Sequence, residues 1–219
     1  MNEGDKVTSP DRFRWLVLGI LLAGALGLYG ITMCWGAYPG LPAKSLAWHL
    51  WLDAYPTLLD GLWGRMVRLC AAFSGGNVAG WMGGLSAVFG AGCVAGLAAL
   101  MMRVRYPLHD AHDPDEVRRE AQARLLAGLT SGLFVMFSVP FWVMSTRSLP
   151  GTFHLLMLMG AVWLFSEYQR TGRFVCLYLL GLLYGVGLTE FATFWVFAPL
   201  AAILVVRAML QRAELSWTV

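Results

Sequence analysis

Apolar residues along this chain gather into six runs that are long enough, or nearly long enough, to cross a membrane. The runs extend over Trp15–Trp35, Val78–Met102, Leu125–Thr146, Leu149–Ser166, Phe174–Thr189 and Phe191–Val206. A helix rises about 1.5 Å per residue, so about 20 apolar residues cross a hydrocarbon core roughly 30 Å thick. The pattern predicts an all-α integral membrane protein with six transmembrane helices, in which residues 1–219 form a single polytopic domain.

The last two runs leave an alternative open, because only Glu190 separates them. Read as one helix, Phe174–Val206 would be about 50 Å long, which exceeds the bilayer unless the helix is tilted or kinked. Gly185, Gly187 and Thr189 favour a tight turn between two short spans instead. Six spans are therefore expected, with five as the alternative.

The basic residues predict the orientation of these spans. If the N-terminus is cytoplasmic, twelve of the sixteen Lys and Arg residues fall on the inner side, and the outer side holds only Lys44, Arg65, Arg68 and Arg147. Basic residues close to membrane spans remain on the cytoplasmic side. Both termini are therefore expected in the cytoplasm.

Small residues at four-residue spacing indicate how the spans pack. Such faces let helix backbones approach closely in lipid, and packing within one bundle is the expected role here. The faces carry Gly19, Ala23, Gly27, Gly76, Gly80, Gly84, Gly92, Gly96, Gly128, Gly132, Gly181 and Gly185. Pro140 and Pro199 lie inside runs and predict kinks that neighbouring helices tolerate.

The outer loop Gly36–Asn77 differs from an ordinary polar loop, because it contains three Trp residues and many Leu residues. Ser45 and Thr57 are each placed to cap a helix before an apolar run, and Pro56 separates the two pieces. From Leu58 onward, apolar residues recur at helical spacing. The loop therefore predicts two short amphipathic helices that lie on the outer membrane surface and are anchored by Trp48, Trp51 and Trp63.

The composition agrees with a membrane protein, since 58% of the residues are hydrophobic and 13% are charged. The net charge of +3 comes from the inner segments, and it indicates contact with anionic lipid rather than nucleic acid, because no basic stripe with interleaved aromatics is present. Cys34 and Cys70 both fall on the outer side, where a disulfide between them remains an alternative to two free thiols.

The inner loop contains a histidine-rich and acidic segment, His109–Glu116. Asp113 followed by Pro114 and two acids is typical of a helix N-terminus, so a metal cluster is the less favoured interpretation. No Cys and His spacing in the chain resembles a zinc site. No metal and no cofactor is therefore expected.

Short motifs in the outer loop and the spans point to a family. They are Tyr55-Pro56 with Gly64-Arg65, Leu85-Ser86-Ala87, Phe137–Trp142, Tyr184–Leu188 and Ala198-Pro199. In order and placement, these motifs resemble the bacterial protein O-mannosyltransferase-like family of GT-C type polytopic glycosyltransferases. The resemblance implies sugar transfer from a polyprenyl-phosphate donor to a protein or glycan acceptor at the bacterial inner (plasma) membrane.

The polar motifs depart from that family. Leu41–Ser45 contains no acid where the resemblance implies an acidic pair, Leu149–Gly151 replaces Glu-Val-Tyr, and Glu190-Phe191 replaces Asn-His. Three alternatives therefore stay open: a fragment or inactive relative of the enzyme, a non-catalytic membrane scaffold or subunit that binds another membrane protein, and, less favoured, a transporter.

Glycosyl transfer needs a base for the acceptor hydroxyl and cations for the leaving phosphate. Asp53 and Asp60 are the candidate bases, although Asp60 could instead be an ordinary acid in the first turn of a helix. The candidate partners of the donor phosphate are Arg65, Arg68 and His49, and the two arginines could instead bind lipid head groups.

Glu190 is a further polar candidate, because an acid between two apolar spans is expected to be functional. Its predicted place at a loop edge would let it reach water. His154 and Glu167 stand at the two ends of the fourth run, where long or polar side chains reach the interface without a special role.

Overall fold

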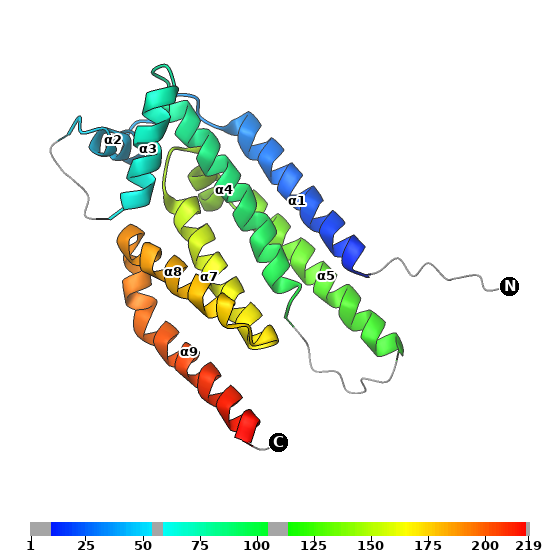
Figure 1. Ribbon diagram of the computed structural model, residues 1–219. Helices are drawn as coiled ribbons and strands as arrows, with labels where there is room; N and C mark the ends of the chain where they lie inside the picture. The colour runs from blue at the N-terminus through cyan, green and yellow to red at the C-terminus, as the bar shows by residue number, and fades with distance from the viewer. Residues whose placement is uncertain (1–9, 54–58, 105–113, 218–219) are drawn as a thin grey trace. The chain divides into compact units, whose positions relative to one another are not determined.

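The computed structural model describes residues 10–53, 59–104 and 114–217, and within these ranges the chain is helical and has no strand (Figure 1). The helices are α1 (Pro10–Thr32), α2 (Leu41–His49), α3 (Gly61–Phe73), α4 (Val78–Met101), α5 (Pro114–Phe137), α6 (Val139–Thr146), α7 (Gly151–Thr171), α8 (Phe174–Glu190) and α9 (Ala192–Trp217). The all-α prediction is confirmed.

Several of these helices are apolar enough to indicate a membrane protein. Arg12–Thr32, Val78–Met101 and Ala192–Gln211 each have the length and hydropathy of a transmembrane span. α5 and α6 have the length and hydropathy of a transmembrane span only when they are taken together, and this pair is bent by 65°. α8 is apolar but has 17 residues, fewer than a span usually needs. All six predicted runs are helical, and three or four spans are supported within the described part of the chain.

The bend between α5 and α6 confirms the kink predicted at Pro140. Ser138 is extended, with φ −65° and ψ 120°, and Pro140 lies in the first turn of α6. A proline there removes no hydrogen bond, because the first amides of a helix have no intrahelical acceptor. The predicted third run is therefore two helices.

The break between α8 and α9 lies at Phe191, just after the turn that the sequence predicted at Gly185, Gly187 and Thr189. α8 continues through Gly185 and Gly187 to Glu190, and only Phe191 is extended, with φ −145° and ψ 127°. Glu190 is therefore the last residue of a helix and is 1% exposed. The prediction that Glu190 sits at a water-accessible loop edge is wrong.

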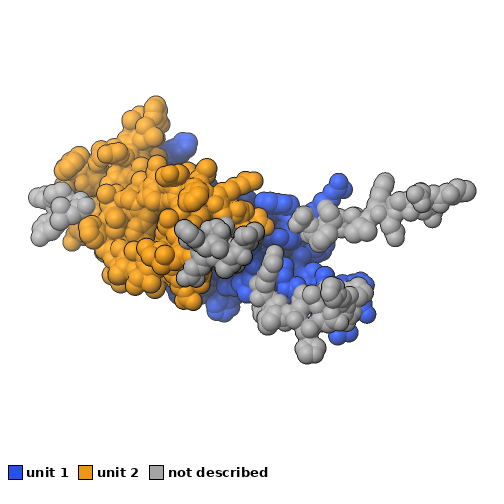
Figure 2. All heavy atoms as spheres, turned by 60° about the horizontal axis from the view of Figure 1, so that its bottom comes forward, with its two compact units in different colours: residues 1–38, 79–152 blue, residues 39–78, 153–219 orange. Residues whose placement is uncertain are grey.

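Residue contacts divide the chain into two units, coloured separately in Figure 2. The first unit includes α1, α4, α5 and α6. Its core joins Leu21, Ala25 and Tyr29 of α1 to Val94 and other small residues of α4. Tyr29 also donates a hydrogen bond of 3.1 Å to the carbonyl of Met136, so the core ties α1 to α5 by a polar contact as well as by packing.

Glycines permit close packing in this unit, but only at some of the predicted positions. A Cβ at Gly128 would lie 2.9 Å from the Ala98 carbonyl oxygen, and a Cβ at Gly132 would lie 2.8 Å from Leu21. At Gly27 and Gly84, nothing lies within 4 Å of that position. The predicted packing face of α5 is confirmed, whereas those glycines of α1 and α4 do not mark a contact.

The second unit contains α2, α3, α8, α9 and all but the first two residues of α7. α2 packs on α3, α3 packs on α8, and α8 packs on α9. α2 and α3 are the two helices predicted for the outer loop. Trp63 is fully buried in this unit, so its predicted role as a membrane-surface anchor is wrong.

The start of α2 also differs from the prediction. Gly40, with φ 97°, precedes the helix, and Pro42 lies in its first turn. Ser45 is therefore inside α2 and does not cap it. The reason is that Pro42 is already suited to a first helical turn. The predicted cap at Thr57 and the motif at Tyr55-Pro56 lie outside the described residues.

Two further predictions concern the inner loop and the cysteines. α5 begins at Pro114 with Asp115 and Glu116 in its first turn, as predicted, while the residues from His109 to Asp113 lie outside the described ranges. Cys34, Cys70, Cys93 and Cys176 are all free thiols, so the disulfide alternative is not realised.

Gly128→Ala should destabilise the protein by about 1–3 kcal/mol, because the added methyl group meets backbone on the neighbouring helix and cannot be accommodated by rotating a side chain. Gly27→Ala is the control, and it should be neutral or slightly stabilising, since its site is open. Thermal unfolding in detergent checks both variants. Equal melting temperatures for the two variants would contradict the packing.

Candidate functional site

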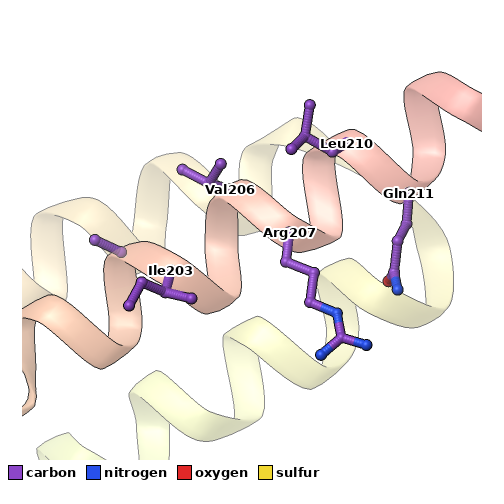
Figure 3. Close-up of a pocket in the computed structure, with 6 residues that line it drawn as sticks. Ile203, Val206, Arg207, Leu210 and Gln211 are labelled. Atoms are coloured by element: carbon purple, nitrogen blue, oxygen red, sulfur yellow. The ribbon is translucent and has the colours of Figure 1, made fainter.

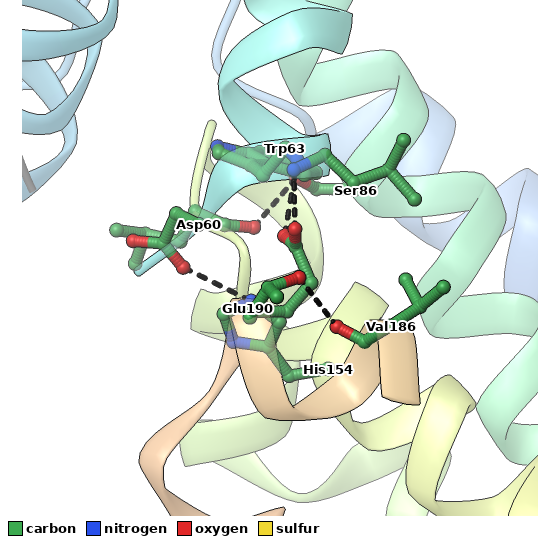
Figure 4. A network of polar contacts seen from close by, with 9 residues as sticks. Asp60, Trp63, Ser86, His154, Val186 and Glu190 are labelled. Carbon is green, nitrogen blue, oxygen red and sulfur yellow. Dashed lines mark hydrogen bonds and ion pairs between the residues drawn. The ribbon is translucent and has the colours of Figure 1, made fainter. Parts of the chain in front are cut away.

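Three polar side chains from distant parts of the sequence meet in the second unit. Asp60 precedes α3, His154 lies in the first turns of α7, and Glu190 ends α8. One ligating atom from each lies within 4.8 Å of those of the other two. We call these residues the Asp60–His154–Glu190 cluster (Figure 4).

Glu190 holds the beginning of α3. Its carboxylate accepts hydrogen bonds from the backbone amides of Leu62 and Trp63, the latter at 3.1 Å. The first amides of a helix lack intrahelical acceptors, and the helix dipole favours a negative charge beside them. Glu190 therefore satisfies α3 from another helix, which explains why a carboxylate can be buried there.

The side chain of Asp60 does not cap α3. Asp60 stands at the N-cap position of α3 with φ 62°, yet its side chain makes no capping hydrogen bond. Its backbone amide donates to the Glu190 carbonyl at 3.2 Å. Asp60 therefore precedes the first turn of α3 and does not cap it through its side chain, and Glu190 supplies the capping carboxylate. The Asp60 carboxylate faces His154 instead.

His154 is 4% exposed and is held by aromatic rings. It stacks on Phe191 with ring centroids 4.7 Å apart and an angle of 16° between the planes. Its Nε2 lies 3.0 Å from Asp60 Oδ1, an ion-pair distance that lacks the alignment of a hydrogen bond. The expectation that His154 reaches the interface is wrong, because its side chain is buried.

His49 lies beside the start of α3 and is buried. Gly64 makes room for its side chain, because a Cβ at Gly64 would lie 2.7 Å from His49 Nδ1. Burial lowers the pKa of His49, and Arg68 lowers it further, against the opposite effect of Asp60 and Glu190. A lowered pKa disfavours the cationic form that binds phosphate well, so the arginines are the better phosphate candidates.

Asp53, Arg65 and Arg68 are exposed. Asp53 accepts a hydrogen bond of 3.2 Å from Trp48 Nε1 and does not belong to the cluster. Arg65 and Arg68 follow Asp60 on α3, one and two turns into the helix. Of the predicted site residues, the structure brings together Asp60 and Glu190, adds His154 to them, and places His49 and the two arginines on the adjoining helices.

The C-terminal half of α9 carries an open hollow of roughly 570 Å³ (Figure 3). Four of its six lining residues are apolar, and the other two are Arg207 and Gln211. It contains no acid and none of the cluster residues. An apolar surface with one cation suits contact with lipid, and it offers no group for acid–base chemistry.

Glu190→Ala should destabilise the protein by about 2–4 kcal/mol, because two backbone amides of α3 lose a charged acceptor and such hydrogen bonds contribute roughly 1.5–3 kcal/mol each. Glu190→Gln keeps one acceptor oxygen and should lose less. Glu167→Ala removes an exposed pair with Arg170 and is the control, with an expected loss below about 0.5 kcal/mol. Thermal unfolding in detergent ranks the three variants, and a Glu190→Ala variant as stable as the control would contradict the capping role.

Comparison with known proteins gives one family. No curated protein and no solved structure matches the chain significantly. Residues 58–214 match the family described as "Protein O-mannosyl-transferase TMEM260 N-terminal domain". The match begins just before α3 and reaches into the last part of α9, so it includes all three cluster residues and well over half of the chain. The chain therefore belongs to the protein O-mannosyl-transferase TMEM260 N-terminal domain family.

Proposed function

We propose that this chain is the membrane module of a GT-C type glycosyltransferase that transfers a sugar from a polyprenyl-phosphate donor to a hydroxyl group of a protein or glycan. Family membership supports sugar transfer to a hydroxyl. The observation that carries the proposal is a partly exposed acid, Asp60, oriented by a buried histidine and followed by two exposed arginines on one helix.

In this proposal, Asp60 is the general base. The acceptor hydroxyl oxygen attacks the anomeric carbon of the donor, the bond from that carbon to the phosphate oxygen breaks, and the phosphate leaves with the bonding electrons. Asp60 takes the hydroxyl proton. Arg65 and Arg68 bind the phosphate as its charge develops, since arginine matches phosphate with paired N–H donors.

The structure favours Asp60 over the other acids for this role. The Asp60 side chain is 20% exposed, so a hydroxyl can reach it, whereas Glu190 is buried and already accepts two backbone hydrogen bonds. Asp53 is exposed and engaged with Trp48. His154 positions the Asp60 carboxylate without itself contacting the acceptor.

The proposed reaction requires the cluster to face the outer side of the membrane, where lipid-linked sugars of this type are used. We propose six spans with both termini in the cytoplasm, on the basis of the twelve-to-four division of basic residues. The bacterial inner membrane is proposed from the resemblance to a bacterial family alone. α8, with 17 residues, is then the short span, which requires local thinning of the bilayer or packing against neighbours.

Single cysteines at residues 44 and 115, each introduced on a background without the four native cysteines, test that topology. A membrane-impermeant maleimide added to intact cells should label residue 44 and should label residue 115 only after lysis. Labelling of residue 115 in intact cells, or protection of residue 44, would contradict the orientation.

Asp60→Asn should lower the transfer rate by about 10²–10⁴, because the base is lost while the size of the side chain is kept. Arg65→Ala should mainly raise the KM for the donor, because a charge-assisted phosphate contact is lost. Sugar transfer from a polyprenyl-phosphate donor in nanodiscs measures both, with Asp53→Asn as the matched acid. Full activity of Asp60→Asn together with loss of activity in Asp53→Asn would move the base to Asp53.

A non-catalytic scaffold is the second candidate, and one observation favours it. The first turn of α2 contains no acid, although the resemblance implies an acidic pair in this region. Purified wild-type protein that transfers no sugar from any donor supplied, and that copurifies in a fixed ratio with another membrane protein, would support the scaffold over the enzyme.

A further inference from the structure

We infer that the Asp60–His154–Glu190 cluster binds a divalent transition-metal cation and holds Zn²⁺ more tightly than Mn²⁺. The three residues offer one imidazole nitrogen and two carboxylate groups. The inference extends beyond the proposed transfer, which needs only Asp60 as a base, and it is tested without any sugar donor.

The positions of the three donor atoms suit a shared cation. They lie within 4.8 Å of one another, and Asp60 Oδ1 and His154 Nε2 are 3.0 Å apart. Two ligands about 2.0–2.2 Å from one zinc ion are separated by roughly 3–3.5 Å at the usual angles. A small inward movement of Glu190 would therefore complete a three-residue site.

The state of His154 is the second, independent observation. The side chain is 5% exposed, and its Nε2 makes no aligned hydrogen bond although an acidic oxygen is 3.0 Å away. A buried polar atom without a hydrogen bond is costly. A cation shared by Nε2 and Oδ1 would bind a lone pair on each atom. Unlike a direct hydrogen bond, this does not require the two atoms and a hydrogen to lie nearly in line.

Glu190 remains available as a ligand despite its bonds to α3. Each carboxylate oxygen has two lone-pair sites, and the amides of Leu62 and Trp63 use one site on each oxygen. These amides also fix the orientation of the carboxylate, as outer-shell hydrogen bonds do for metal ligands. The cluster is therefore oriented before a cation arrives.

The ligand types select the class of cation. Imidazole nitrogen suits zinc, copper, iron and nickel, whereas magnesium and calcium prefer oxygen ligands alone. Affinity for a given nitrogen and oxygen site rises from manganese to copper and falls again at zinc, which still binds more tightly than manganese. Three protein ligands leave at least one coordination position, and the partial exposure of Asp60 opens that position to solvent.

The experiment measures Zn²⁺ binding to the purified chain of residues 1–219, after removal of any affinity tag. His109 and His112 are replaced by Gln in the parent, because these residues of the inner loop could bind zinc themselves. Competition with a chromophoric chelator should show one Zn²⁺ per chain. His154→Gln and Asp60→Asn should each weaken binding about 10- to 100-fold or more, since even outer-shell changes cost that much.

Two controls make the result specific. Asp53→Asn removes an exposed acid that is not in the cluster, and it should bind Zn²⁺ as the parent does. Co²⁺ bound in place of Zn²⁺ should show visible absorption without a thiolate charge-transfer band, which excludes the free cysteines as ligands. Asp60→Asn keeps its size and is partly exposed, so it should fold even if His154→Gln does not.

Binding by His154→Gln and Asp60→Asn with parental affinity would overturn the inference, and so would a parent that binds no Zn²⁺. The latter outcome would mean that His154 and Asp60 form only an ion pair. Because no donor is present, loss of Zn²⁺ binding and loss of sugar transfer are separate results, and either proposal can fail while the other stands.

Discussion

The second unit depends on one interaction, the carboxylate of Glu190 against the first amides of α3. It joins the end of one helix to the start of another that is more than a hundred residues away in sequence. The helix dipole and the unsatisfied amides make this a favourable place for a buried negative charge. Because Glu190 supplies the cap, the side chain at the N-cap position, Asp60, is free to face His154.

Glu190 and Asp60 therefore have different roles, although the sequence makes both of them candidate acids. Glu190 is buried and accepts two backbone hydrogen bonds, so its charge stabilises the start of α3. Asp60 is held by its backbone and by the nearby imidazole, while its carboxylate still reaches solvent. Proton transfer to an acceptor from solvent needs an accessible acid, so Asp60 and not Glu190 is suited to that role.

The helices were predictable from the sequence because apolar periodicity and length are local properties. The details that failed depend on tertiary contacts. Ser45 looked like a cap, but Pro42 already opens that helix. Trp63 looked like a surface anchor because its helix is amphipathic, yet it is fully buried, and its ring lies 6.0 Å from that of Phe153 on α7. Gly19, Ala23 and Gly27 of α1 have the same spacing as Gly128 and Gly132 of α5. Of these four glycines, only the two of α5 would bring a Cβ within 4 Å of a neighbouring helix.

The candidate site was predicted in part, since Asp60 and Glu190 were both named while His154 was considered alone and set aside. A signal for His154 was present, because the charge-based topology places the start of the fourth run, the end of the fifth run and the outer loop on the same side of the membrane. Polar residues at the ends of different spans can come into contact when they lie on the same side of the membrane. What the sequence could not supply is the geometry: the capping of α3 by Glu190 sets the direction of the Asp60 carboxylate, and that direction makes His154 part of the site.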